Sequence, residues 1–441
     1  MTFAAIKGTP LTEIIARHKA GASVGVYSVC SAHPVVVDAA IAQAADDGSP
    51  VLIEATSNQV DQFGGYTGMR PNDFRDMVFD IAERRGYSRD RVILGGDHLG
   101  PNRWQRLPAA EAMANAEDLI AAYVEAGYTK IHLDCSMSCA DDPAVLGDEV
   151  VAARSARLLR IADAAAEKIG TEGALSYVIG TEVPVPGGAR ETLDAVTPTP
   201  PERAQSTIDA HRAAFAETGL DRMWPQIVAL VVQPGVEFDH VKVVDYQRAA
   251  TTGLRSVLDT EPHLVFEAHS TDYQRPAQLR ELVEDHWAIL KVGPGLTFAL
   301  REAMFALAMI EKELVSPAAQ SNLIDVVEQR MLDDPGYWQS YYDGDAQSQR
   351  TARRYSYSDR LRYYWADSRV DAARKALIAN LTQTGIPLPL ISQFLPDQYH
   401  RIRDGILAAD PAALVTDRVR GALRPYAQAC LLDRRDGATI D

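Results

Sequence analysis

The chain has 441 residues, and its 44 Lys and Arg against 60 Asp and Glu give a formal charge of -16. This excess of negative charge argues against nucleic acid or an anionic membrane surface as a partner. A hydrophobic content of 46% excludes a disordered chain, and only four cysteines exclude a dense disulfide framework, so a reducing cytoplasm is the expected location. No run approaches the ~20 apolar residues of a membrane span, and the first residues lack an export signal.

Eight short apolar runs recur along the chain, and helix-patterned stretches separate them. Buried runs of this kind are typical of parallel strands that are covered on both faces. Eight of them predict an α/β fold, a (β/α)8 TIM barrel, whose strand ends and following loops form one functional face. The predicted strands are residues 23–29, 51–56, 92–98, 129–134, 175–182, 227–233, 263–269 and 288–293.

The chain is longer than the ~250 residues of a bare barrel, so it should carry an addition. Residues 297–314 are patterned as a helix that would close the barrel, and beyond them Tyr and Trp become frequent. We therefore predict a barrel over residues 1–314 and a helical extension, packed on the barrel, over 315–441.

Three predicted strands end in residues that commonly bind metal ions. His98 follows the third strand, Glu182 the fifth and His269 the seventh. A His, Glu, His set suits a divalent ion, with zinc expected and manganese the alternative, and leaves positions for a chelating substrate. A histidine that only caps the next turn is the competing interpretation for His98 taken alone.

Other polar residues at strand ends are candidates for proton transfer or substrate contact. Asp97 and Asp134 are candidate acids or bases, and Glu267 is either a catalytic group or a residue that orients His269. Gln233 could ligate through oxygen or hold a substrate hydroxyl. His33 either touches substrate or begins a helix before Pro34. A zinc-thiolate site from His132, Cys135 and Cys139 is disfavoured, because one Cys-x3-Cys lacks a second pair.

A phosphate site is predicted after the seventh and eighth strands, the usual position in such barrels. Ser270, Thr271 and Thr297 are the candidate contacts, and Lys291 could add positive charge. The alternative is that the Gly293-Pro-Gly sequence is only a tight turn.

Several long motifs are specific to one family. The strings Leu94-Gly-Gly-Asp-His-Leu-Gly-Pro-Asn102, Phe266-Glu-Ala-His-Ser-Thr-Asp-Tyr-Gln274 and Lys291-Val-Gly-Pro-Gly-Leu-Thr297 resemble the GatZ/KbaZ family of tagatose metabolism. The resemblance covers nearly the whole chain and extends to class II aldolases, whose zinc histidines stand at strand ends. It implies a metal role for His98 and His269 and a matching position for Glu182. One aldolase zinc histidine, after the sixth strand, has no counterpart here, and Gln233 stands near its position.

The resemblance implies two different roles. Some family members epimerise D-tagatose 6-phosphate to D-fructose 6-phosphate, and others stabilise a class II tagatose-bisphosphate aldolase subunit without catalysing a reaction. We expect the epimerase, an isomerase acting on a phosphorylated ketohexose, because a supporting chain needs no convergent metal-type set. Asp97 or Asp134 would take the C4 hydroxyl proton, C3–C4 cleavage would follow, and re-addition to the other aldehyde face would invert C4. An aldolase partner and a homo-oligomer are both compatible with the sequence, and it contains no P-loop or kinase signature.

Overall fold

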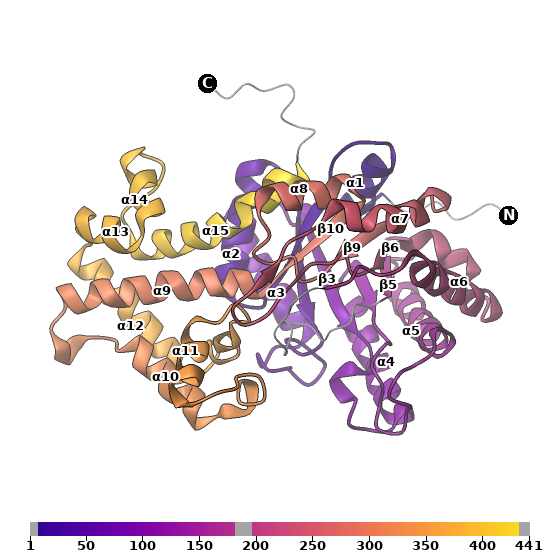
Figure 1. The fold of residues 1–441 in the computed structure, drawn as a ribbon, viewed down its shortest axis with the longest axis horizontal. Coiled ribbons are helices and arrows are strands. Elements are labelled where there is room, and N and C mark those ends of the chain that lie inside the picture. The colour runs from indigo at the N-terminus through magenta and orange to yellow at the C-terminus, as the bar shows by residue number, and fades with distance from the viewer. Residues whose placement is uncertain (1–7, 181–195, 432–441) are drawn as a thin grey trace.

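The protein folds into a closed barrel of eight parallel strands, seen in a computed structural model that describes residues 8–180 and 196–431 (Figure 1). Neighbouring strands follow one another around the barrel in chain order, and β1 pairs with β10 to close it. The predicted TIM barrel and its eight strands are confirmed. The barrel strands are β1 (Val26–Cys30), β2 (Val51–Thr56), β3 (Val92–Leu99), β4 (Lys130–Leu133), β5 (Ser176–Gly180), β6 (Ile227–Val231), β9 (Val265–Ala268) and β10 (Trp287–Val292).

Almost every residue of these strands is buried, because helices cover the barrel outside and side chains fill it inside. The amino-terminal end of the barrel is filled by α1, whose Leu11 and Ile15 join Val26, Leu52 and Ile289 in one apolar cluster. The opposite end holds polar side chains. This division leaves the carboxyl ends of the strands as the face available for chemistry.

The helices alternate with the strands and then continue into a C-terminal extension. The helices are α1 (Pro10–Lys19), α2 (Pro34–Asp47), α3 (Pro71–Arg84), α4 (Ala109–Glu125), α5 (Asp148–Ile169), α6 (Pro201–Glu217), α7 (Thr252–Arg255), α8 (Pro276–Glu284), α9 (Pro294–Leu314), α10 (Leu323–Asp333), α11 (Ala346–Tyr355), α12 (Ser368–Thr384), α13 (Leu388–Phe394), α14 (Pro396–Arg403) and α15 (Pro411–Cys430). A short antiparallel pair, β7 (Glu237–Phe238) and β8 (Val243–Val244), lies between β6 and β9 in the chain.

The helix that completes the outer layer is α15, and the prediction that residues 297–314 close the barrel is wrong in this respect. At about 1.5 Å per residue, the 21 residues of α9 span about 30 Å, and Figure 1 shows this helix running away from the barrel into the extension. The last helix returns and packs against α2 and α8, the helices after the first and seventh barrel strands, and against α9. Its end is fixed to the barrel, because the Gly25 N–H donates to the Cys430 carbonyl (3.0 Å).

The last helix of the extension is therefore part of the outer layer of the barrel, while the other helices of the extension lie beside the barrel (Figure 1). The division of the chain between residues 314 and 315 remains a prediction. Among the helices of the described segments, none has the length and apolar character that a membrane crossing needs.

Candidate functional site

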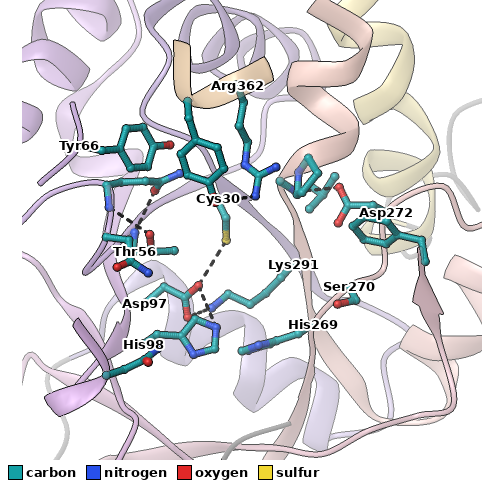
Figure 2. A pocket seen from close by; sticks show the side chains of 18 residues that line it. Cys30, Thr56, Tyr66, Asp97, His98, His269, Ser270, Asp272, Lys291 and Arg362 are labelled. Atoms are coloured by element: carbon teal, nitrogen blue, oxygen red, sulfur yellow. Dashed lines mark hydrogen bonds and ion pairs between the residues drawn. The ribbon is translucent and has the colours of Figure 1, made fainter. Parts of the chain in front are cut away.

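A cavity of about 110 Å³ opens at the carboxyl ends of the strands (Figure 2). Its floor is polar, and one of its walls comes from the C-terminal extension. The lining residues are Cys30, Thr56, Asn58, Gln59, Tyr66, Asp97, His98, Asn102, Phe238, His269, Ser270, Asp272, Lys291, Val292, Gly293, Pro294, Arg362 and Tyr363. Asp97, His98, His269, Ser270 and Lys291 among them were predicted as site residues.

The Gly-Gly-Asp-His sequence of β3 fits the interior of the barrel closely. A Cβ atom on Gly95 would stand 2.6 Å from Oε1 of Glu54, so glycine here makes room for the Glu54 carboxylate. His98 has φ +49°, a left-handed conformation that a histidine rarely adopts. Such conformations concentrate at functional sites, where surrounding contacts hold them. Ser270, after the seventh barrel strand, has a similar φ of +51°.

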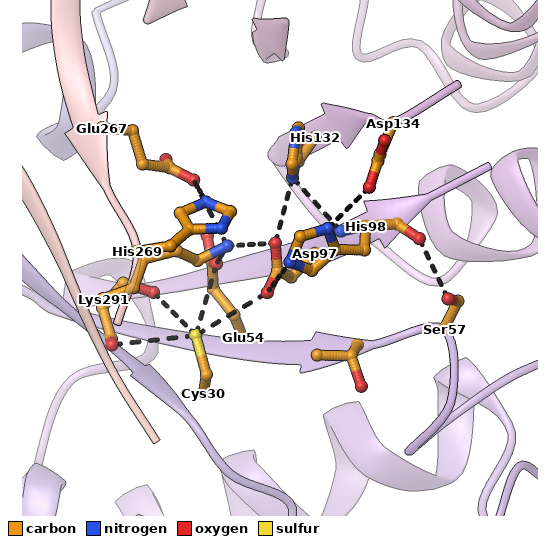
Figure 3. Close-up of polar contacts among 12 residues, drawn as sticks. Cys30, Glu54, Ser57, Asp97, His98, His132, Asp134, Glu267, His269 and Lys291 are labelled. Atoms are coloured by element: carbon orange, nitrogen blue, oxygen red, sulfur yellow. Dashed lines mark hydrogen bonds and ion pairs between the residues drawn. The ribbon is translucent and has the colours of Figure 1, made fainter. Parts of the chain in front are cut away.

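Three histidines meet Asp97 at the centre of the site (Figure 3). One ligand atom from each of Asp97, His98, His132 and His269 lies within 4.8 Å of the others, and all four residues are buried. His132, on β4, was not among the predicted site residues. Glu182, which was predicted as a ligand, lies outside the described residues.

Each of these histidine rings donates one N–H outwards to an acceptor. Nδ1 of His98 donates to Asp134 (2.7 Å), and Nε2 of His269 donates to Glu267 (3.0 Å). Nε2 of His132 donates to the Gly180 carbonyl (2.9 Å). Metal-binding histidines show this pattern, since the outer acceptor fixes the tautomer and turns the second ring nitrogen inwards.

The tautomer of His132 places two electron-pair donors side by side. With the proton on Nε2, Nδ1 carries a lone pair and lies 3.0 Å from Oδ1 of Asp97. The backbone N–H of His98 donates to this nitrogen (3.3 Å), and the Lys291 ammonium contacts the same carboxylate oxygen. The residue types of the cluster fit a divalent metal ion, for which imidazole nitrogen and carboxylate oxygen are common ligands.

The buried charged groups next to the histidines also favour a metal ion. Lys130 contacts Glu54 and Glu267, and Lys291 contacts Glu54, Glu267 and Asp97; these side chains are at most 5% exposed. Together with Asp134, the cluster contains four carboxylates and two ammonium groups. Its formal charge is therefore -2 when the histidines are neutral. A buried excess of negative charge is costly, and a divalent cation would neutralise it.

The surrounding charges also set the protonation states. Burial opposes ionisation of Asp97, but His98 and Lys291 outweigh it and hold the pKa of this carboxyl well below its usual range. Burial and Lys291 lower the pKa of His269 to about 3, so this ring is neutral at pH 7. The pKa of His98 is raised, because Asp97 and Asp134 outweigh the effect of burial.

The structure gives Asp134 and Glu267 similar positions behind the histidines. Asp134 accepts from His98 through Oδ2 and from the hydroxyl of Ser136 (2.6 Å) through Oδ1, and it does not line the cavity. Glu267 contacts His269 and both lysines and is fully buried. Both carboxylates hold other site residues, whereas Asp97 lines the cavity itself.

The side chain of Gln233 is bonded within its own loop. Its Oε1 accepts from the N–H groups of Gly235 (2.8 Å) and Val236 (2.9 Å), which fixes the loop after β6. This oxygen is therefore engaged in its own loop, and Gln233 is not among the residues that line the cavity.

The predicted phosphate site is filled by a carboxylate from the protein. Oδ1 of Asp272 accepts from the N–H groups of Gly293 (2.9 Å) and Gly295 (2.7 Å) at the start of α9. These are the groups that would otherwise bind an anion. Thr271 is buried and donates to the Lys291 carbonyl (2.6 Å), so it does not reach the cavity.

Two further predictions fall beside the main cavity. His33 caps α2, where its Nδ1 accepts from the Val35 N–H (3.2 Å), so its helix-entry role is present. Thr297 donates to the Pro294 carbonyl (3.1 Å) within the first turn of α9. Both residues line a second cavity of about 460 Å³, which shares Cys30, Tyr66 and Arg362 with the first.

Solved structures of known proteins are similar to this chain to different degrees. A crystal structure of a probable tagatose 6 phosphate kinase from Sinorhizobium meliloti 1021 is 48% identical, with a TM-score of 0.85, and covers 92% of this chain and 100% of its own. The YdjI aldolase from Escherichia coli K12 is 12% identical (TM-score 0.41, 86% of this chain and 97% of its own). A fructose-bisphosphate aldolase from Campylobacter jejuni is 15% identical (TM-score 0.43, 85% of this chain and 93% of its own).

A family model covers almost the whole chain, from residue 11 to residue 431. Its description is "D-tagatose-1,6-bisphosphate aldolase subunit GatZ/KbaZ-like". The matched range includes the barrel, the histidine cluster and the extension through α15. The chain therefore belongs to the GatZ/KbaZ-like family.

Proposed function

We propose that this protein is a metal-dependent epimerase that converts D-tagatose 6-phosphate to D-fructose 6-phosphate by inverting C4. The observation that carries the proposal is the convergence of Asp97, His98, His132 and His269 within 4.8 Å, where all but His132 line the cavity. A protein that only supports another subunit has no need for such a cluster. The family, with its link to tagatose metabolism, supports the choice of substrate.

The three histidines are the residues that would hold the ion. A divalent metal there, with zinc expected and manganese the alternative, would supply a Lewis acid that polarises the C2 carbonyl of the ketose. Asp134 and Glu267 keep the His98 and His269 rings in the required tautomers and orientations.

Asp97 is the proposed acid and base, because it lines the cavity and is not needed to orient a ring. Lys291 keeps it ionised, so it can accept the proton of the C4 hydroxyl. As the C3–C4 bond breaks, its electron pair stays on C3 and C4 becomes an aldehyde carbon. The aldehyde fragment turns over, C3 attacks its other face, and Asp97 returns the proton to the C4 oxygen.

The second candidate is a non-catalytic subunit that stabilises a class II aldolase. The word "subunit" in the family description favours it, and it predicts a stable complex with a second polypeptide. A kinase is not supported, because the chain has neither a P-loop nor a kinase signature.

Proton NMR of the purified protein with D-tagatose 6-phosphate tests the proposal. We expect D-fructose 6-phosphate to appear with Zn²⁺ or Mn²⁺, to stop appearing after EDTA treatment, and to return when the ion is restored. His269→Ala should lose both the metal and turnover, whereas His400→Ala, at an exposed position on α14, should keep both. A protein inert with either ion, but able to raise the activity of an added class II aldolase subunit, would establish the second candidate instead.

A further inference from the structure

The C-terminal extension contributes a positively charged residue to the site cavity. Arg362 lies in the short helical turn Arg360–Tyr364, and Figure 2 shows its side chain reaching into the cavity above Cys30. The neighbouring Tyr363 also lines this cavity, and its ring packs against Tyr66 from the barrel (centroids 4.8 Å apart). Residues from both parts of the chain thus form the wall opposite the histidines.

Only two lysine or arginine residues line the cavity, and they differ in their partners. Lys291 contacts three carboxylates, from Asp97, Glu54 and Glu267. Arg362, by contrast, makes no ion pair with any carboxylate in residues 8–180 or 196–431. Its Nη1 donates to the carbonyl of Asp359 (3.2 Å) and to that of Ser358, and its Nη2 donates to the Tyr363 hydroxyl (3.0 Å).

These bonds leave donors for a ligand. A guanidinium has five N–H groups, so Nε and one N–H of Nη2 have no acceptor among the described residues. A half-buried guanidinium without a carboxylate partner is costly, and an anion in the cavity would offset that cost. Phosphate oxygens match the planar fork of an arginine particularly well.

The usual anion position of the barrel is closed to the substrate. Asp272 already accepts from the N–H groups of Gly293 and Gly295, and its charge would repel a phosphate there. The protein as a whole is negatively charged, so an anionic substrate needs a local positive group. Arg362 is the group in this cavity that meets the need.

We propose that Arg362 binds the phosphate of the substrate, so that the C-terminal extension determines the preference for phosphorylated over neutral ketohexoses. The inference rests on the proposed function for the identity of the sugar. The phosphate binds on the extension side of the cavity, while the reacting carbons lie over the histidines on the barrel side.

The test is calorimetric binding of D-tagatose 6-phosphate, D-tagatose and inorganic phosphate to EDTA-treated protein, which requires no turnover. Arg362→Gln should weaken binding of the phosphosugar and of phosphate by about 10- to 100-fold, the effect of losing hydrogen bonds to a charged group, and should leave D-tagatose unchanged. Arg374→Gln is the matched control, because Arg374 lines the second cavity but is held by Asp371 (2.6 Å). Circular dichroism and Tm establish that the variants are folded.

The outcomes separate this inference from the proposed function. Binding lost in Arg362→Gln while the wild type shows no epimerase activity would support the phosphate site and overturn the proposed reaction. Equal affinity of wild type and Arg362→Gln, loss in Arg374→Gln instead, or a wild type that binds neither phosphate compound, would overturn the inference. Should Arg362→Gln not fold, Arg362→Lys replaces it: it keeps the charge but not the fork, and its phosphosugar affinity should fall by about 3- to 10-fold.

Discussion

The replacement Asp134→Asn separates the two carboxylates that the sequence left as alternative bases. In the structure Oδ2 of Asp134 accepts from His98, while Oδ1 accepts from the N–H (3.2 Å) and hydroxyl (2.6 Å) of Ser136. Asparagine can keep the bond to His98 through its carbonyl. Its amide group must then face the Ser136 N–H, where it cannot accept a bond, and the negative charge behind the ring is lost.

The expected effect is on metal affinity and not on the chemical step. Loss of a carboxylate behind a metal-binding histidine typically weakens the metal by 10- to 100-fold, or about 1.4 to 2.8 kcal/mol. We therefore expect the Kd for Zn²⁺ to rise by this factor in Asp134→Asn, with turnover recovering to within a few-fold of wild type at saturating metal. Asp97→Asn should instead lose about 10²- to 10⁴-fold in turnover at saturating metal, because it removes the proton acceptor.

The assay is competition for Zn²⁺ with a chromophoric chelator, followed by NMR turnover at saturating metal. Ser136→Ala is the control, since it removes one bond to Asp134 without changing its charge, and its Zn²⁺ affinity should change less. The reasoning is refuted if Asp134→Asn binds Zn²⁺ as tightly as wild type but loses turnover as completely as Asp97→Asn. In that case Asp134 would be the acid and base.

Three other replacements test separate parts of the structure. Lys291→Met removes one of the two lysines that contact the buried carboxylates. The free energy of unfolding, measured with urea, should fall by about 3 to 5 kcal/mol. An unchanged unfolding midpoint would contradict the importance of this ion cluster. Gln233→Leu removes the acceptor of two buried N–H groups, so the free energy of unfolding should fall by about 2 to 6 kcal/mol. The amount of metal bound per chain should stay the same. Loss of metal would instead identify Gln233 as a ligand. Burial, then Arg374, lowers the pKa of His33 to about 3, so folding is disfavoured as pH falls below the unfolded value of about 6.5. His33→Asn keeps the cap on α2 but cannot be protonated. Relative to wild type, its free energy of unfolding should be about 1 to 2 kcal/mol more favourable at pH 5 than at pH 7.5. Parallel curves of stability against pH for the two proteins would refute this assignment.

The barrel could be predicted because its strands are buried on both faces, which makes each a continuous apolar run ending in polar residues. The same reasoning predicted that Asp97, His98 and His269 lie together at the carboxyl ends of the strands, as they do in the structure. His132 was missed although the signal was present. Side chains alternate along a strand, so Lys130 and His132 point to the same side of β4, into the barrel.

Contacts within loops are harder to predict from a residue pattern. Nothing in the composition distinguishes an Asp272 that occupies an anion site from one that is exposed to solvent, and the Gly-Pro-Gly turn was therefore interpreted as open to phosphate. Likewise, its place at a strand end made Gln233 a candidate oxygen ligand, but the N–H of Gly235, two residues later, donates to its side chain. Such short-range bonds depend on backbone angles that a residue pattern does not specify.

The cavity is formed jointly by the barrel and the C-terminal extension. Arg362 lies 71 positions after Lys291, yet both line one cavity, because α9 carries the chain away from the barrel and the segment after α11 brings it back over the strand ends. α15 then packs between α2 and α8 and fixes the end of this excursion to the barrel wall. A change that loosens α15 should therefore disturb the position of Arg362 while leaving the histidine cluster, which the strands hold, in place. The proposed substrate selection and the proposed metal binding would thus depend on different parts of one fold.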